Sequence, residues 1–155
     1  MNIFYLHENP QVAANYMYNK HVVKMILESA QMLCTAHHHY GNHDVPYKKA
    51  HYNHPSTIWV RKSRNHYYWL YLHMMALGDE YTRRYGKIHS TIHKCGEVLR
   101  NHPEGMPDVP FRQPPQCMPD EYKCASSVEA YWNYYIGEKH SVANSDEVVK
   151  TEQFT

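Results

Sequence analysis

The sequence lacks any long apolar run, and its four cysteines form no close pair. No stretch approaches the roughly 18 consecutive apolar residues that span a bilayer, so a membrane-spanning protein is not expected. The first residues do not combine a basic stretch with a following apolar stretch, which argues against a signal peptide. Reduced thiols are therefore expected, and Cys34 is interpreted as a small core residue.

Several common catalytic motifs are also missing. The sequence has neither G-x-x-x-x-G-K nor G-x-G-x-x-G, the glycine-rich loops that hold phosphate groups, and it has no serine nucleophile elbow. These absences exclude the common nucleotide hydrolases, dehydrogenases and esterases. The formal net charge is only +1 with neutral histidine, so bulk charge does not indicate a nucleic-acid partner.

Tyrosine and histidine are abundant instead. The chain of 155 residues contains 15 tyrosines and 14 histidines but only three phenylalanines. Tyrosine rings can form a core or stack on nucleic-acid bases, and the histidines would add positive charge on mild acidification. Because 43% of the residues are hydrophobic and 20% charged, the composition predicts a folded chain with one core.

The clearest helical pattern runs from Lys20 to about Ala36. Residues at 3.6-residue spacing give it an apolar side that contains Val22, Val23, Ile26, Leu27, Ala30, Leu33 and Cys34. The polar side contains Lys20, His21, Lys24, Glu28 and Gln31. A solvated helix face would show the same division, so the pattern leaves open whether this polar side is a site.

A second helical segment extends from Ser56 to Tyr85, as one helix of roughly 40 Å or as two helices with a break near Gly78. The side expected to face solvent carries Arg61, Arg64, Asp79, Thr82 and Arg83. The opposite, apolar side also carries His66, His73, Glu80 and Arg84. Ionisable groups are costly to bury unless they are paired or functional, so these four have two interpretations.

The first interpretation is structural: Glu80 and Arg84 form an ion pair and the histidines are hydrogen-bonded in the core. The second is a cleft between this segment and the Lys20–Ala36 helix. In that cleft Glu28 or Glu80 would supply a carboxylate, and His21 or Lys24 its partner, for acid–base work or for stabilising a cationic intermediate.

The rest of the chain predicts short elements and connections. The first part of the chain predicts an apolar strand or arm at 2–6 and a helix opened by Asn9-Pro10. A loop at 37–54 follows the first long helix, and the next helix starts at His54-Pro55 with Ser56 or Thr57 as cap. The last part predicts a short helix near 89–100, a proline-rich strap at 101–122 and a last helix from Val128 to about Lys139 that is capped by Ser126 or Ser127. The predicted fold is therefore mainly α. We expect a compact single domain over residues 1–140, a bundle of three to five helices with a short N-terminal strand or arm and the strap, followed by a tail at 141–155.

Metal binding is not predicted. His89 and His93 are spaced four apart with Cys95 nearby, and residues 37–39 form a histidine cluster with His43. No set of four ligands has a recognised zinc spacing, and H-E-x-x-H is absent. No cofactor is expected.

Three short motifs give the sequence a family resemblance. They occur in the same order as in the family and cover about two thirds of the chain. A segment with an early histidine at 3–9 precedes a helix opened by Lys20-His21. Tyr52-Asn53-His54-Pro55 leads into a segment that ends with Glu80-Tyr81-x-x-Arg84-Tyr85-Gly86. The aromatic stretch at 131–139 is similar to the Trp-Tyr-x-Tyr-Tyr-Gly-Lys stretch of the endonuclease V-type pyrimidine-dimer DNA glycosylases of phages, whose bacterial relatives share the middle motif. The chain also resembles small phage proteins that share its 20–28 and 118–123 stretches.

This resemblance implies a helical fold, a DNA substrate, base excision and strand nicking. It also implies that the α-amine at the processed amino terminus attacks the sugar C1′ and forms an imine, assisted by a glutamate on the first long helix. The sequence departs from that pattern at the chemistry. Asn2, in place of threonine, is too large to favour removal of Met1, and His21 occupies the position suggested for the acid. Glu28, two turns later on the same face, is the substitute carboxylate, and Lys20 or Lys24 is an alternative amine.

The leading hypothesis is thus a DNA glycosylase or lyase that acts on damaged or modified bases. Its catalytic candidates are Glu28, His21, Lys24 and Met1. Its substrate-binding candidates are Lys20, His54, Arg61, Arg64, His66, Glu80, Arg84, Tyr134 and Lys139. The alternatives are a non-catalytic DNA-binding module on the same fold, a histidine-rich metalloenzyme acting on nucleotides, and an interaction protein with a tyrosine homodimer face. A monomer with DNA as partner and no membrane contact is expected in the cytoplasm, that of the host if a phage encodes the chain.

Overall fold

A computed structural model describes residues 2–138, which contain six α-helices, two 3₁₀ turns and no strand. The helices are α1 (Pro10–Tyr16), α2 (Asn19–His39), α3 (Pro55–Arg61), α4 (Arg64–Tyr85), α5 (Ser90–Cys95) and α6 (Ser127–Gly137), and the turns are η1 (Val98–Arg100) and η2 (Asp120–Tyr122). The mainly α prediction is confirmed. The structure has six helices where three to five were expected, because the 56–85 segment forms two; the 89–100 segment forms the short α5 followed by η1.

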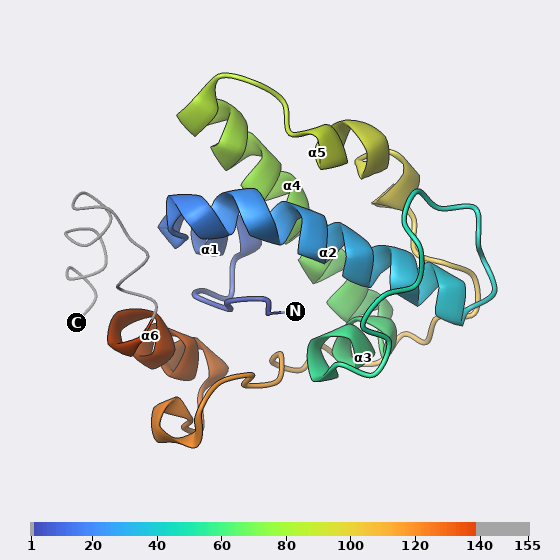
Figure 1. Cartoon of the computed structure of the whole chain (residues 1–155). Coiled ribbons are helices and arrows are strands. Elements are labelled where there is room, and N and C mark those ends of the chain that lie inside the picture. The colour runs from blue at the N-terminus through green and yellow to red at the C-terminus, as the bar shows by residue number, and fades with distance from the viewer. Residues whose placement is uncertain (1, 139–155) are drawn as a thin grey trace.

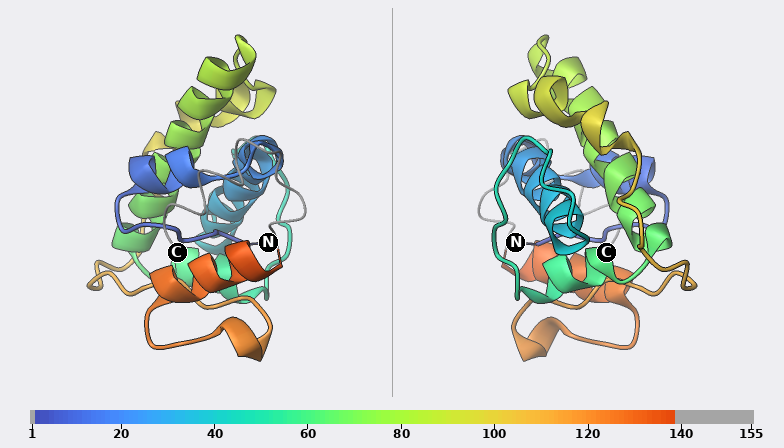
Figure 2. Two further views of the ribbon diagram at one scale, coloured as in Figure 1. Left: turned by 90° about the vertical axis from the view of Figure 1, so that its left-hand side faces the viewer. Right: turned by 90° about the vertical axis from the view of Figure 1, so that its right-hand side faces the viewer.

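The two long helices α2 and α4 cross at the centre of the molecule and carry much of the core (Figure 1). Helix α1 also packs against α4, and α3 packs against α2. Residues 2–6 are an extended arm rather than a strand, and they run between α2 and α6 (Figures 1 and 2). The indole N–H of Trp132 in α6 donates to the carbonyl of Leu6 at 2.8 Å, which ties the arm to the last helix.

The break in the 56–85 segment lies at Lys62-Ser63 and not near Gly78. The Ser63 hydroxyl accepts the Asn65 backbone N–H at 3.1 Å and so caps a new helix. Gly78 stays helical, and a Cβ at this position would lie 2.7 Å from Ile92 Cγ1 of α5. The glycine therefore permits close helix packing, which its sequence neighbourhood could not reveal.

Helix α2 confirms the predicted Lys20–Ala36 helix, but its two faces differ from the expectation. Val22, Ile26 and Leu33 are fully buried as expected. His21, expected on the polar side, is only 7% exposed, whereas Val23 and Leu27 are each 39% exposed. The reason is tertiary: the amino-terminal arm covers the side of α2 that carries His21, so the helix is buried over a different arc than its own pattern indicates.

The strap is confirmed as irregular chain laid along α3 and α4. Arg64 contacts it through its backbone N–H, which donates to Pro107 at 2.9 Å, and through Nε, which donates to Met106 at 2.8 Å. The indole N–H of Trp59 donates to the Arg112 carbonyl at 2.9 Å. The predicted tail at 141–155 lies outside the described residues.

Candidate active site at the amino-terminal arm

The arm begins with a side-chain clamp at Asn2. Asn2 Nδ2 donates to the Cys117 carbonyl of the strap at 2.9 Å, while Asn2 Oδ1 accepts the Phe4 backbone N–H at 3.2 Å. The side-chain amide of Asn2 therefore ties the arm to the strap through its nitrogen and fixes the backbone of the arm at Phe4 through its oxygen. Sequence reasoning treated Asn2 only as a departure from the family pattern and missed this role, since the partner carbonyl lies 115 residues away.

Phe4 anchors the arm to α2 and α6. Its ring stacks on His21 with centroids 4.4 Å apart, and on Tyr134 with centroids 6.4 Å apart. The His21 ring is also hydrogen-bonded to α6, because its Nδ1 lies 2.6 Å from the Tyr135 hydroxyl. His21 and Tyr134 are both buried, so in the described structure they hold the arm in place.

Glu28 is a half-buried carboxylate further along α2, the helix to which His21 anchors the arm. Its side chain is 14% exposed, and Oε2 lies 3.8 Å from Nζ of Lys24, one turn earlier on α2, whose side chain is 66% exposed. Lys20 is also exposed on α2. The helix therefore carries solvent-exposed amines and, one turn from Lys24, a carboxylate that is largely shielded from solvent.

His54 lies at the start of α3, the helix that packs against the Glu28-bearing α2. Its Nδ1 accepts the Ser56 backbone N–H at 3.1 Å, so the imidazole caps the helix, in place of the expected Ser56 or Thr57. Burial lowers the pKa of His54, the positive charges of the amino terminus and His51 act in the same direction, and the Glu28 carboxylate opposes them. His54 is thus within electrostatic range of Glu28 and of the start of the chain.

Backbone strain is concentrated beside these residues. Among residues 2–138 only Phe4 and His51 are non-glycine residues with positive φ, at 55° and 47°. A bulky residue in this conformation is an outlier that costs roughly 1–3 kcal/mol and persists only where the surroundings enforce it. Such strain is typical of functional sites, and here it lies in the arm and in the turn before His54.

Arg61 was predicted to face solvent, but its side chain is buried. Its guanidinium is stacked over the Tyr52 ring, with Cζ 3.9 Å from the centroid, and NH1 donates to the Tyr52 carbonyl at 2.7 Å. The hydroxyl of Tyr52 lies 2.6 Å from His39 Nδ1. Arg61 therefore fixes the 40–54 loop, a contact that depends on the loop folding back and is invisible to helical periodicity.

His66 and His73 are core histidines with backbone partners. His66 Nδ1–H donates to the Trp59 carbonyl at 2.7 Å, and its Nε2 accepts the Arg112 backbone N–H at 3.0 Å. His73 is fully buried, and its Nδ1–H donates to the Pro10 carbonyl at 3.0 Å. Both contacts fit the structural interpretation of the apolar side of α4.

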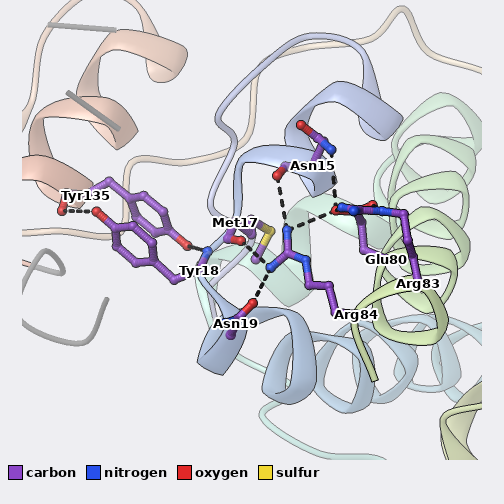
Figure 3. A network of polar contacts seen from close by, with 8 residues as sticks. All are labelled: Asn15, Met17, Tyr18, Asn19, Glu80, Arg83, Arg84 and Tyr135. Atoms are coloured by element: carbon purple, nitrogen blue, oxygen red, sulfur yellow. Dashed lines mark hydrogen bonds and ion pairs between the residues drawn. The ribbon is translucent and has the colours of Figure 1, made fainter. Parts of the chain in front are cut away.

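Glu80 and Arg84 form a separate network that joins α4 to the α1–α2 junction (Figure 3). Glu80 Oε1 accepts from Arg83 at 2.6 Å and from Arg84 at 2.9 Å. Arg84 also donates to the Met17 carbonyl and to Asn19 Oδ1, each at 2.9 Å. This ion-pair network again corresponds to the structural interpretation.

The two glutamates lie on different helices, Glu28 on α2 and Glu80 on α4, and they are near different turns of α2. Arg84, the partner of Glu80, contacts Asn19 in the first turn of the helix, and Glu28 lies nine residues further on. At 1.5 Å per residue this is a separation of about 13 Å along the helix axis. Glu28 therefore acts electrostatically on His54, while Glu80 contacts Asn15 and the two arginines. Met1 and Lys139, both predicted site residues, lie outside the described residues.

The histidine clusters are organised by hydrogen bonds. His38 Nε2–H donates to the Tyr47 carbonyl at 2.9 Å, and its Nδ1 lies 2.7 Å from Nδ1 of His43. His89 caps α5 by accepting the Thr91 backbone N–H. Within residues 2–138 no group of three or more histidine, cysteine, aspartate or glutamate side chains is arranged to hold a metal ion.

Acid is expected to destabilise the protein through two buried histidines. Burial lowers the pKa of both His37 and His73 to about 4, from an ordinary value of 6.5. Each contributes stability that is complete above about pH 6.5 and is lost as the pH falls towards 4, because only the unfolded chain binds the proton in that window. The free energy of unfolding should fall by about 1.4 kcal/mol per pH unit for each histidine.

Urea unfolding measured at several pH values between 7 and 4 would test this expectation. In a His73→Gln variant the free energy of unfolding should fall less steeply with falling pH than in the parent protein, by about 1.4 kcal/mol per pH unit, because one histidine fewer binds a proton on unfolding. A stability that stays flat between pH 6.5 and 4.5 would contradict it.

These features define a class: an all-α protein whose first long helix carries a half-buried carboxylate with an amine one turn away and anchors an amino-terminal arm. A family model described as pyrimidine dimer DNA glycosylase matches residues 1–94, more than half of the chain. The chain belongs to the pyrimidine dimer DNA glycosylase family, and this membership implies a DNA repair glycosylase whose substrate is DNA. The matched range includes the arm, α1 to α4 and most of α5. Searches among curated proteins and among solved structures found no match. No described helix combines the length and apolar character that crossing a bilayer requires.

Proposed function

We propose that this protein is a DNA glycosylase with lyase activity on damaged or modified bases, and that Glu28 stabilises the cationic intermediate. The observation that carries the proposal is the position of Glu28, a carboxylate only 14% exposed, one turn from Lys24 on the helix to which the strained arm is anchored through His21. A carboxylate held in such a partly dry setting interacts more strongly with positive charge than one in water.

The proposed step is a displacement at the sugar C1′. The amine nitrogen forms a bond to C1′, the bond from C1′ to the base breaks, and its electron pair leaves with the base. The nitrogen then loses a proton to solvent, and the sugar ring opens with a proton delivered to its ring oxygen, which leaves an imine. Glu28 offsets the positive charge on the sugar and then on the imine, and β-elimination from the imine nicks the strand.

The two candidate amines are the α-amine of Met1 and Nζ of Lys24. An α-amine ordinarily has a pKa near 8, so about a tenth or more of it is neutral and nucleophilic near neutral pH. The positive charge at the amino terminus contributes to the lowered pKa of His54, which supports an α-amine within electrostatic range of His54. We therefore favour the α-amine, with Lys24 as the second candidate.

Borohydride trapping on duplex DNA with a single abasic site tests the proposal. The protein should form a covalent adduct, and peptide mapping should locate it at the amino terminus, with Lys24→Ala retaining the adduct. Absence of an adduct together with absence of nicking would overturn the mechanism. Salt-dependent duplex binding without either reaction would instead indicate the non-catalytic DNA-binding module.

A further inference from the structure

His54 caps α3, and its local structure fixes which ring nitrogen carries the proton. The residue precedes Pro55 with an extended backbone, and Nδ1 accepts the Ser56 N–H at 3.1 Å. A nitrogen that accepts a hydrogen bond cannot itself be protonated, so the ring hydrogen is on Nε2. As long as α3 is capped in this way, His54 is a neutral imidazole that can only donate from Nε2.

The same arrangement occurs at α5, where it provides a matched comparison. His89 Nδ1 accepts the Thr91 N–H at 3.1 Å, and its Nε2–H donates to the Val23 carbonyl at 3.2 Å. His54 Nε2 has no hydrogen-bond partner among residues 2–138. Of these two capping histidines, the one near Glu28 therefore has a donor still available for a ligand.

The surroundings of His54 connect it to the arm as well as to Glu28. The Ser56 hydroxyl in the first turn of α3 lies 3.4 Å from Cys117 Sγ, and the Cys117 carbonyl accepts from Asn2. The strained turn at His51 leads directly into the cap, since the His54 N–H donates to the His51 carbonyl at 3.0 Å. His54 is thus held by the same contacts that fix the start of the chain.

We infer that the Nε2–H of His54 donates a hydrogen bond to the base that leaves when the C1′–N bond breaks. This inference rests on the proposed function. The electron pair of that bond leaves with the base, so negative charge develops there while the sugar becomes positive. Glu28 suits the sugar but would repel the departing base. A neutral donor stabilises the base without the repulsion that a lysine or arginine would exert on the cationic sugar.

The donor acts only while a base is leaving, and this separates it from a structural role. His54→Asn keeps a capping oxygen for α3 and lacks the Nε2–H, and His54→Ser does the same with a shorter side chain. Base release from ultraviolet-irradiated duplex is expected to fall about 10²-fold in both variants under single-turnover conditions. Nicking of duplex with a preformed abasic site, where no base leaves, should stay within about twofold of the parent rate.

His89→Asn is the matched control, because it makes the same replacement at the cap of α5. It should leave both rates unchanged. Equal loss of base release and of abasic-site nicking in the His54 variants would overturn the inference, and so would unchanged base release. If the parent protein itself shows no base release and no trapped imine, the proposed function fails, which is a different result from a parent protein that is active and insensitive to His54.

Discussion

Replacement of Glu28 with glutamine is expected to lower the rates of base release and of imine trapping about 10³-fold, with duplex binding nearly unchanged. Glutamine has nearly the same shape but no charge, so the variant removes the stabilisation of the cationic sugar without opening a cavity. Preorganised groups that act on transition-state charge contribute about 10²- to 10³-fold each, and the low exposure of Glu28 favours the upper part of this range. Single-turnover kinetics on irradiated and abasic-site duplexes measure both rates.

Glu97→Gln is the control for this experiment. Glu97 also forms an ion pair one turn away, with Arg100 at 3.8 Å, but its side chain is 88% exposed. Its replacement should leave both rates unchanged, because a solvated carboxylate exerts little field. A Glu28→Gln protein that is folded, binds DNA and retains full activity would eliminate Glu28 as the stabilising carboxylate.

Removal of the Glu80 carboxylate is expected to cause the largest loss of stability among single side-chain changes in the ion-pair network. Arg84 is 13% exposed, and Glu80 is the acidic partner that it contacts. Glu80→Ala leaves this guanidinium buried without a counter-charge, which costs roughly 3–5 kcal/mol. Urea denaturation followed by tryptophan fluorescence would measure the loss as a lower midpoint.

Arg83→Ala tests the same network from its exposed side. Arg83 donates to Glu80 at 2.6 Å, but its side chain is 61% exposed, so its loss should cost no more than about 1 kcal/mol. Equal losses in the two variants would contradict the distinction between buried and exposed partners. Burial raises the pKa of Glu80, but hydrogen bonds from Arg83 and Arg84 outweigh it and leave that pKa lowered. The stability from Glu80 is therefore complete above about pH 4.5 and is lost as the pH falls through the folded value.

Local sequence signals predicted the helices well where they were strong. The Asn9-Pro10 start, the long α2, the strap and the Ser126 cap of α6 are all as expected, because caps, proline and periodicity act within a few residues. Gly78 shows the limit of such signals. A glycine that breaks a helix and a glycine that admits a packed neighbour look the same in sequence, and only Ile92 of α5 distinguishes them.

The candidate site was predicted in its residue types but only partly in its arrangement. Glu28 and Lys24 are four residues apart on one helix, so their proximity follows from helical spacing. Glu28 and Glu80 were both candidates for one cleft, and sequence could not show that they contact different partners. The Asn2 clamp and the Phe4 anchor were missed, since each depends on residues more than a dozen positions away.

The sequence by itself determined the mainly helical class, the family motifs and the presence of one carboxylate among amines on the first long helix. It did so because hydrophobic periodicity, capping and short motifs are local properties. Only the tertiary structure decided that His21 is buried under the arm, that Glu80 belongs to a structural network, and that the imidazole of His54 caps α3 with its donor nitrogen fixed. These outcomes depend on which segments cover one another, and burial, hydrogen-bond partners and charge environment are set by that packing and not by spacing along the chain.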